Sequence, residues 1–180
     1  MMKAFYEVGL IKSIRFFFST LFLFLFNFSL FPSVRRIALK MVGAKIGADT
    51  VIHEVRFFNA YRTGFQGLSI GKSCFLGTDC LIDLADKVIL EDDVTLAERV
   101  TILTHINVGY KDHPLQQFFP SSQSEVRIKR GAFIGANATI VSGISIGECA
   151  FVAAGSMVIH DVAPWTLVAG APARMVRSIK

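Results

Sequence analysis

The chain has 180 residues and a formal net charge of +5, with 52% hydrophobic and 18% charged residues. That length suits one domain with appendages. Three cysteines, Cys74, Cys80 and Cys149, are odd in number and lack metal-ligand spacing. These features exclude a disulfide framework and indicate a reducing compartment, so we expect a cytoplasmic protein.

The positive charge is confined to the N-terminus. Residues 1–40 hold six basic and one acidic side chain, whereas residues 41–180 hold thirteen of each. A nucleic-acid-binding protein needs a basic stripe on its folded body, so this pattern instead indicates an anionic membrane surface. We therefore expect peripheral contact of residues 1–40 with the inner face of a membrane.

A Phe-rich stretch, FFFSTLFLFLFNFSLF, covers residues 16–31. Sixteen helical residues rise roughly 24 Å, which is short of the ~30 Å hydrocarbon core of a bilayer. We predict a basic, hydrophobic helical segment over residues 1–40, ended or kinked at Pro32. Three roles remain open: lying in the membrane interface, inserting as a short re-entrant hairpin, or packing on the body or in an oligomer interface.

The rest of the chain, residues 41–180, shows a period of six. In its N-terminal half, aliphatic or aromatic residues recur at Ile46, Ile52, Phe58, Ile70, Leu76, Ile82, Leu90, Leu96 and Ile102. Between Ile82 and Leu90, the segment DLADKVI adds two residues to the period of six. Turn positions three places after an inward residue hold Ser73, Asp79, Asp93 and Arg99.

The period is strictest between residues 128 and 158. The inward positions there are Ile128, Ile134, Ile140, Ile146, Val152 and Val158, and the turn positions are Gly131, Asn137, Gly143, Cys149 and Gly155. Gly and Asn accept positive φ. This period fits neither an amphipathic helix nor an alternating strand, but it is typical of a hexapeptide β-helix. With three hexads per turn, residues 18 apart stack, which predicts an all-β triangular prism.

No hexad covers residues 103–125, LTHINVGYKDHPLQQFFPSSQSE. Loops of this length inside a regular fold are often functional. His105 is three places after Ile102, so it occupies a turn position, and we predict that it points outward as a general base. His113 lies within the loop as an alternative base or as a cap of the turn before Pro114.

Two runs carry a family resemblance: VILEDDVTLAERVTILTH before the loop, and the tail AAGSMVIHDVAPWTLVAGAPARMVR. Over residues 70–178 the chain resembles the hexapeptide-repeat acyltransferases, in particular the maltose, galactoside and surface-polysaccharide O-acetyltransferases. The resemblance implies a left-handed parallel β-helix, a homotrimer with sites between subunits, and acetyl-CoA as the acyl donor. From the tail sequence itself, with Pro164 and Pro172 as breakers, we also predict a short C-terminal helix from about Ala173.

The same resemblance implies roles for individual residues. Ala136 and Ala154 match positions that contact the pantetheine arm of CoA, and Arg174 and Arg177 match two arginines near its phosphates. Sugar acetyltransferases carry their catalytic histidine where this chain has Asn107, whereas a related motif of polysaccharide acyltransferases places it at His105.

We therefore expect an O-acetyltransferase that moves an acetyl group from acetyl-CoA to a hydroxyl of a sugar or surface glycan, with His105 as the base. We expect no metal and no nucleic acid. Two alternatives remain: a zinc β-helix enzyme of the γ-carbonic-anhydrase type, which needs three convergent histidines, and a non-catalytic trimeric scaffold. Thioester cleavage separates the first interpretation from the other two.

Overall fold

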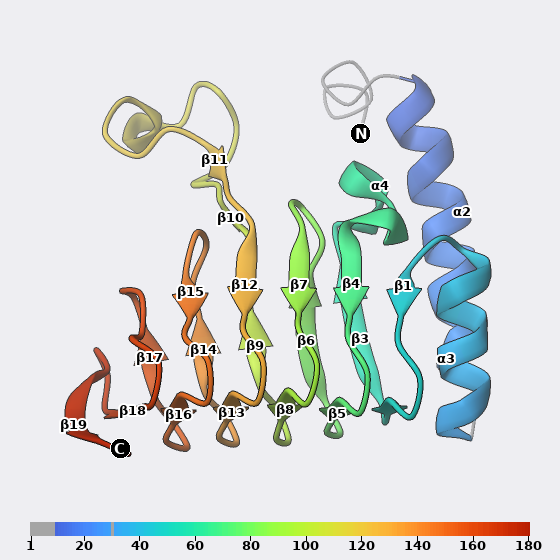
Figure 1. Cartoon of the computed structure of the whole chain (residues 1–180). Helices are drawn as coiled ribbons and strands as arrows, with labels where there is room; N and C mark the ends of the chain where they lie inside the picture. The colour runs from blue at the N-terminus through green and yellow to red at the C-terminus, as the bar shows by residue number, and fades with distance from the viewer. Residues whose placement is uncertain (1–9, 30) are drawn as a thin grey trace.

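Three parallel sheets form the sides of a left-handed parallel β-helix in the computed structural model, which describes residues 10–29 and 31–180 (Figure 1). Sheet A contains β1 Lys45–Ile46, β4 Leu68–Ile70, β7 Val88–Leu90, β12 Val126–Ile128 and β15 Ser145–Ile146. Sheet B contains β2 Val51–Ile52, β5 Phe75–Leu76, β8 Thr95–Leu96, β13 Phe133–Ile134, β16 Phe151–Val152, β18 Thr166–Ala169 and β19 Arg174–Ser178. Sheet C contains β3 Val55–Phe58, β6 Cys80–Asp83, β9 Thr101–Ile102, β14 Thr139–Ile140 and β17 Met157–Val158. The chain visits the sheets in turn, so each three strands complete one coil.

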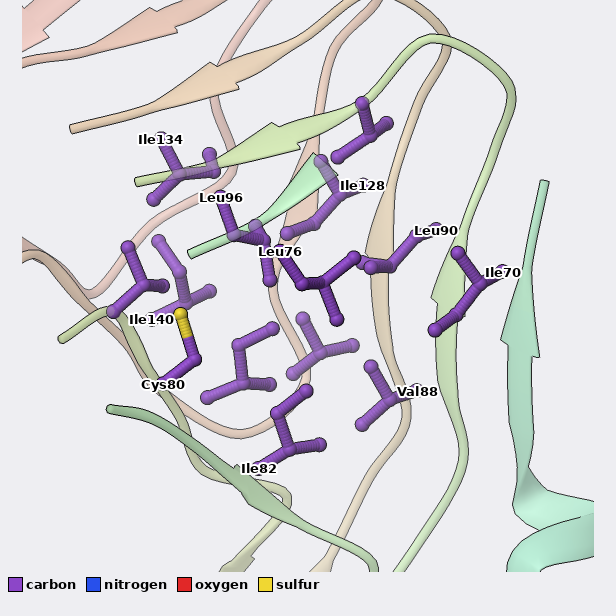
Figure 2. Packing of buried hydrophobic residues seen from close by; sticks show 14 of the residues in the cluster. Ile70, Leu76, Cys80, Ile82, Val88, Leu90, Leu96, Ile128, Ile134 and Ile140 are labelled. Carbon is purple, nitrogen blue, oxygen red and sulfur yellow. The ribbon is translucent and has the colours of Figure 1, made fainter. Parts of the chain in front are cut away.

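The interior of the prism is filled by aliphatic side chains, as the period of six predicts (Figure 2). All six residues predicted to point inward between 128 and 158 are at most 1% exposed. They stack in columns, with Ile128 beside Ile146 and Ile140 beside Val158 in neighbouring strands. Burial of each such side chain contributes about 1.5–3 kcal/mol. The hydrophobic columns are therefore the main stabilising feature of the coil.

The turns between strands have the predicted left-handed backbone. Apart from His105, the turn residues predicted along the coil, from Ser73 to Gly155, all have φ between +51° and +83°. Other positions need glycine for space: a Cβ on Gly135 would lie 2.5 Å from the backbone nitrogen of Ala154 in the next coil. The turn glycines are thus explained by their positive φ, and glycines such as Gly135 by the close stacking of successive coils.

Two details differ from the sequence prediction. In β3 the inward residue is Phe57, which pairs with Ile82, and Phe58 is only half-buried. The irregular segment after residue 52 shifts the register there by one residue. The C-terminal tail forms no helix from Ala173; its residues form β19, which runs antiparallel to β18 and extends sheet B.

The Phe-rich N-terminal segment forms two helices at one end of the prism (Figure 1). α2 spans Leu10–Phe26 and α3 spans Pro32–Met41, so the helical segment breaks before Pro32, which starts the second helix. Two phenylalanines of α2 fix it to the body: Phe22 contacts Phe65, and Phe26 contacts Phe57, with ring centroids 5.1 and 6.0 Å apart. Packing on the body, one of the three roles that the sequence left open, is therefore observed for these two side chains of α2.

Short helices and a hairpin complete the chain. The segment between β3 and β4 forms α4 Ala60–Thr63 and a 3₁₀ turn, η1 Phe65–Gly67. The long loop begins and ends in two antiparallel strands, β10 His105–Ile106 and β11 Ser122–Gln123, and includes η2 Pro114–Gln117. Figure 1 shows this loop projecting away from the coil.

Candidate functional site

Asp83, at the end of β6, has a fully buried carboxylate. In space it lies beside Thr104, where the long loop begins. One carboxylate oxygen accepts hydrogen bonds from Asn59 Nδ2 at 2.8 Å and from the Ala85 backbone N–H at 3.0 Å. The other oxygen accepts the Thr104 backbone N–H at 3.0 Å and contacts His105 Nδ1. Asp83 is thus held by four donors from three segments of the chain.

These donors determine the ionisation of Asp83. Burial raises the pKa of the carboxyl, but hydrogen bonds from Asn59, His105 and Thr104, together with the charge of His105, outweigh burial and lower the pKa below its ordinary value of 3.8. Hydrogen bonds to a charged form favour that form. Asp83 is therefore an ionised group inside the protein at neutral pH.

His105 is held on this carboxylate in a different way from the prediction. It is the first residue of β10, paired with Gln123, and it does not have the left-handed backbone of a turn position. Its side chain is 21% exposed, with the ring near Phe58, whose centroid lies 6.5 Å away. After Ile102 the chain leaves the coil as the loop hairpin, so a strand takes the place of the predicted turn.

The contact with Asp83 defines what the imidazole of His105 can do. Because an ionised carboxylate only accepts hydrogen bonds, Nδ1 of His105 carries the proton in this contact. Nε2 of the neutral ring then keeps its lone pair and can accept a proton. A buried carboxylate behind an imidazole also stabilises the imidazolium that forms. The pair therefore has the arrangement of a general base with an orienting partner.

His113 occupies a different environment. It precedes η2, and its Nδ1 accepts the Leu115 backbone N–H at 3.1 Å. The side chain is exposed, with its ring beside Gly109. His113 therefore caps a turn, which was one of the two roles that the sequence left open.

The residues predicted to contact CoA lie on another edge of the prism. Ala136 follows β13 and Ala154 follows β16, so they occupy equivalent turns of successive coils between sheets B and C, joined by a 2.8 Å hydrogen bond from Gly155 N–H to the Ala136 carbonyl. Arg174 pairs with Ala169 of β18 in the next layer, and Arg177 pairs with Leu167. We call this column of turns the B–C edge.

The B–C edge has features that fit a long ligand ending in phosphates. Ala136 is half-buried and Ala154 exposed, and each presents only a methyl group, so the edge is open along two coils. Both arginines are exposed, and each donates to the main-chain carbonyl of an adjacent residue, Arg174 to Ala173 at 3.1 Å and Arg177 to Ser178 at 3.3 Å. These guanidinium groups are free to meet phosphate oxygens.

His105 and the B–C edge are not brought together within one chain. His105 follows β9 at the far end of sheet C, on the edge leading back to sheet A, whereas Ala136 and Ala154 precede the strands of sheet C. In residues 10–29 and 31–180 no three His, Cys, Asp or Glu side chains converge as a metal-ligand set.

Asp83 is the functional residue that sequence reasoning missed as the partner of His105. A signal was present, because an acidic residue stands between Ile82 and Leu84 in an otherwise apolar run. Counting through the two-residue interruption places Ile82 beside Ile102, as the strands show. That register puts Asp83 level with the residues that precede His105.

Comparison with known proteins gives the same fold. The model of the hexapeptide repeat of succinyl-transferase matches residues 67–102 and 125–159. Serine acetyltransferase 2 of Arabidopsis thaliana is 33% identical over 111 residues, which cover 62% of this chain and 32% of the plant protein. The chain therefore spans about a third of the length of this relative.

Two solved structures show how far the likeness extends. A hexapeptide-repeat-containing acetyltransferase from Vibrio cholerae superposes with a TM-score of 0.83 at 22% identity, covering 96% of this chain and 94% of the other. A galactoside acetyltransferase in complex with coenzyme A superposes with a TM-score of 0.78 at 24% identity, covering 94% and 82%. The resemblance drawn from the sequence is confirmed in these hexapeptide repeats and in the fold, a left-handed parallel β-helix that the chain shares with these acetyltransferases.

Proposed function

We propose that this protein transfers an acetyl group from acetyl-CoA to a hydroxyl of a sugar or surface-glycan acceptor, with His105 as general base. The observation that carries the proposal is the contact of His105 Nδ1 with the fully buried carboxylate of Asp83. A scaffold has no need for an ionised carboxylate in its interior. The likeness to named acetyltransferases supports the choice of acetyl transfer.

In the proposed reaction, the chain's own residues move one proton. Acetyl-CoA supplies the acetyl group as a thioester. Nε2 of His105 accepts the proton of the acceptor hydroxyl as its oxygen forms a bond to the acetyl carbon, and Asp83 stabilises the resulting imidazolium. As the carbon–sulfur bond breaks, His105 returns the proton to the departing sulfur. The histidine therefore ends the cycle as it began.

Ala136 and Ala154 would line the pantetheine arm of the donor, and Arg174 and Arg177 would hold its phosphates. A guanidinium group binds phosphate through paired N–H donors, which suits both arginines to this role. The B–C edge offers the donor an open path along the coil towards β19. These assignments follow the family pattern, and the exposure of Ala154 and of both arginines supports them.

We further propose that the active protein is a homotrimer. One chain holds the base and the donor-binding edge on different sides of sheet C, so a complete site requires a second copy that brings its B–C edge to His105. Closed cyclic symmetry then gives three equal sites. Light scattering of the active enzyme should give three times the monomer mass, and an active monomer would refute this arrangement.

The proposed activity is tested by following thiol release from acetyl-CoA with a panel of sugars. The wild-type chain should release thiol in an acceptor-dependent way, and His105→Ala should lose this activity. The matched control is His113→Ala, which removes the other histidine of the long loop. Absence of acceptor-dependent thiol release with every acceptor would favour the scaffold interpretation.

The N-terminal helices support the proposed contact with an anionic membrane surface. Exposed apolar side chains cover the outer faces of α2 and α3, among them Phe17, Phe24 and Ile37, and Phe28 is exposed between the two helices. No acidic residue occurs in either helix, and Arg15 and Lys40 are exposed cations beside these faces. In the described part of the chain, no helix has both the length and the apolar character to cross a bilayer. This combination suits a helix pair lying in the interface.

Vesicle sedimentation tests the membrane contact with the full-length chain. The wild type should bind vesicles that contain anionic lipid more strongly than neutral vesicles, because cations near the surface add to apolar burial. Replacing Phe24 with Ser or Arg15 with Gln should weaken binding, while Lys129→Gln on the coil should not. Equal binding of all four proteins would contradict the proposal, and a lost trimer in the Phe24 variant would assign this face to subunit packing.

A further inference from the structure

A cleft of about 680 Å³ lies beside the Asp83–His105 pair. Its walls come from the start of α2, from α4 and from the long loop, which Figure 1 shows rising on the same side of the coil as α4. Two backbone links connect this cleft to the pair: Ala85, which lines it, donates to Asp83, and Gln123, which also lines it, is the strand partner of His105. An acceptor bound there would lie next to the proposed base.

Among the residues that the structure describes, the charged side chains that line the cleft are all basic. Lys12 comes from α2, Arg62 from α4 and Lys111 from the loop. Within residues 10–29 and 31–180, no carboxylate lines the cleft and none of the three cations has an ion pair. Three cations that converge from separate segments create a positive potential, which low-dielectric walls focus within a cleft. Without Arg62 and Lys111, residues 41–180 hold eleven basic and thirteen acidic side chains, so this positive character is local.

Arg62 is already positioned on the cleft wall. Its Nη1 donates to Gln123 Oε1 at 3.3 Å, its Nε donates to the Tyr61 hydroxyl at 3.5 Å, and its guanidinium carbon lies 6.0 Å from the centre of the Tyr61 ring. The side chain is half-buried and has further N–H groups available. Because Arg62 is already held in place, it loses little conformational freedom on binding an anion. Its paired N–H donors suit a carboxylate or a phosphate.

The loop side of the cleft is also formed in advance. Asn107 Oδ1 accepts the Gly109 N–H at 3.0 Å, and Gln116 Nε2 donates to the Gly109 carbonyl at 2.9 Å. These contacts fix neutral amides and a backbone turn on the loop side of the cleft. Hydroxyls and amides of this kind bind the hydroxyl groups of a sugar. The cleft thus combines neutral polar groups with fixed cations.

From this arrangement we infer that the acceptor is an anionic sugar, with its phosphate or carboxylate on Arg62, Lys111 and Lys12 and its hydroxyl towards His105. The inference rests on the proposed acetyl transfer and specifies its substrate class. A phosphorylated sugar and a uronic acid share this chemistry.

Calorimetric titration of the full-length protein with three probes tests the inference. We expect glucose 1-phosphate and glucuronate to bind at least about tenfold more tightly than glucose at low salt, and the preference to weaken as salt screens the exposed charges. The stronger anionic probe identifies the phosphate or carboxylate class. Arg62→Gln and Lys111→Gln should each remove most of the preference, whereas Lys129→Gln, on the coil, should keep it.

Equal binding of the three probes, or an anion preference that survives in both cleft variants, would overturn the inference. Its failure is distinguishable from failure of the proposed function, because the readout is binding. Acetylation of neutral sugars without an anion preference would leave acetyl transfer standing and refute the anionic acceptor. An anion preference without thiol release would leave anion binding by the cleft standing and refute acetyl transfer.

Discussion

Asp83→Asn is the sharpest test of the candidate site, because it removes the charge with almost no change of shape. The carboxylate accepts two donors on each oxygen: Asn59 and Ala85 on one, Thr104 and His105 on the other. The amide that replaces the carboxylate has only one oxygen. One of the two pairs of donors must therefore face its NH₂ group, which is itself a donor. Whichever way the amide turns, one backbone N–H loses its acceptor.

The magnitude follows from that count. Asn59 can turn its own amide and His105 can change tautomer, but the N–H of Ala85 or of Thr104 stays unsatisfied inside the protein. A buried unsatisfied donor costs about 1–3 kcal/mol, so we expect the free energy of unfolding to fall by that amount. If the NH₂ group faces His105, Nδ1 becomes the acceptor and Nε2 carries the proton. If the amide oxygen faces His105, the imidazolium loses its counter-charge.

Both orientations impair the base, so turnover should fall by about two to four decades. The assay is thiol release from acetyl-CoA with a saturating acceptor, together with urea unfolding. The double variant Asp83→Asn/His105→Ala should be no slower than His105→Ala alone, because the two residues act as a unit. Wild-type turnover in the single variant, or multiplied losses in the double variant, would refute the reasoning.

The same carboxylate links stability to pH. The folded-state pKa of Asp83 lies below its ordinary value of 3.8, so its contribution is fully present above the unfolded-state pKa. It is lost as pH falls through the folded-state pKa. The stability difference between wild type and Asp83→Asn should therefore be constant at neutral pH and shrink below about pH 4. A difference that grows on acidification would contradict this assignment.

Three further changes test the coil and the site. His105→Ala should lower kcat by about two to four decades with CoA affinity unchanged, and the opposite result, with only His113→Ala inactive, would assign the base to the loop. Arg174→Ala should raise the KM for acetyl-CoA by roughly tenfold to a hundredfold with a smaller effect on kcat, and an unchanged KM would remove this arginine from the donor site. Ile140→Ala should lower the free energy of unfolding by about 2–5 kcal/mol in urea titration, whereas its outward neighbour Thr139→Ala should cost less than half of that. Equal losses at these two positions would contradict an inward column.

The coil could be predicted from the sequence because each position in the hexad has one physical requirement. An inward residue such as Ile134 must be aliphatic, and a turn residue such as Asn137 must accept positive φ. Both requirements recur every six residues, so several independent positions agree. The N-terminal coil was harder to read, because the irregular segment after β2 hides that Phe57 is the residue that points inward.

The site was less predictable because it lies where the period fails. His105 was assigned a turn by counting from Ile102, but the hairpin of the loop replaces that turn with a strand. The pairing of His105 with Asp83 depends on residues 22 apart, whereas regular coils bring together residues 18 apart. The cationic cleft joins α2, α4 and the loop, and no local pattern links segments that far apart in sequence.

The long loop leaves the coil without interrupting it. β12 pairs directly with β7, with Val126 beside Val88 and Ile128 beside Leu90, as though the residues between β9 and β12 were absent. The two ends of the loop are tied by the β10–β11 hairpin, and closing a longer loop costs only about 0.6 kcal/mol for each doubling of its length. The loop side of the cleft can therefore change in length and sequence during evolution, while the prism that carries Asp83 and the donor edge keeps its stability.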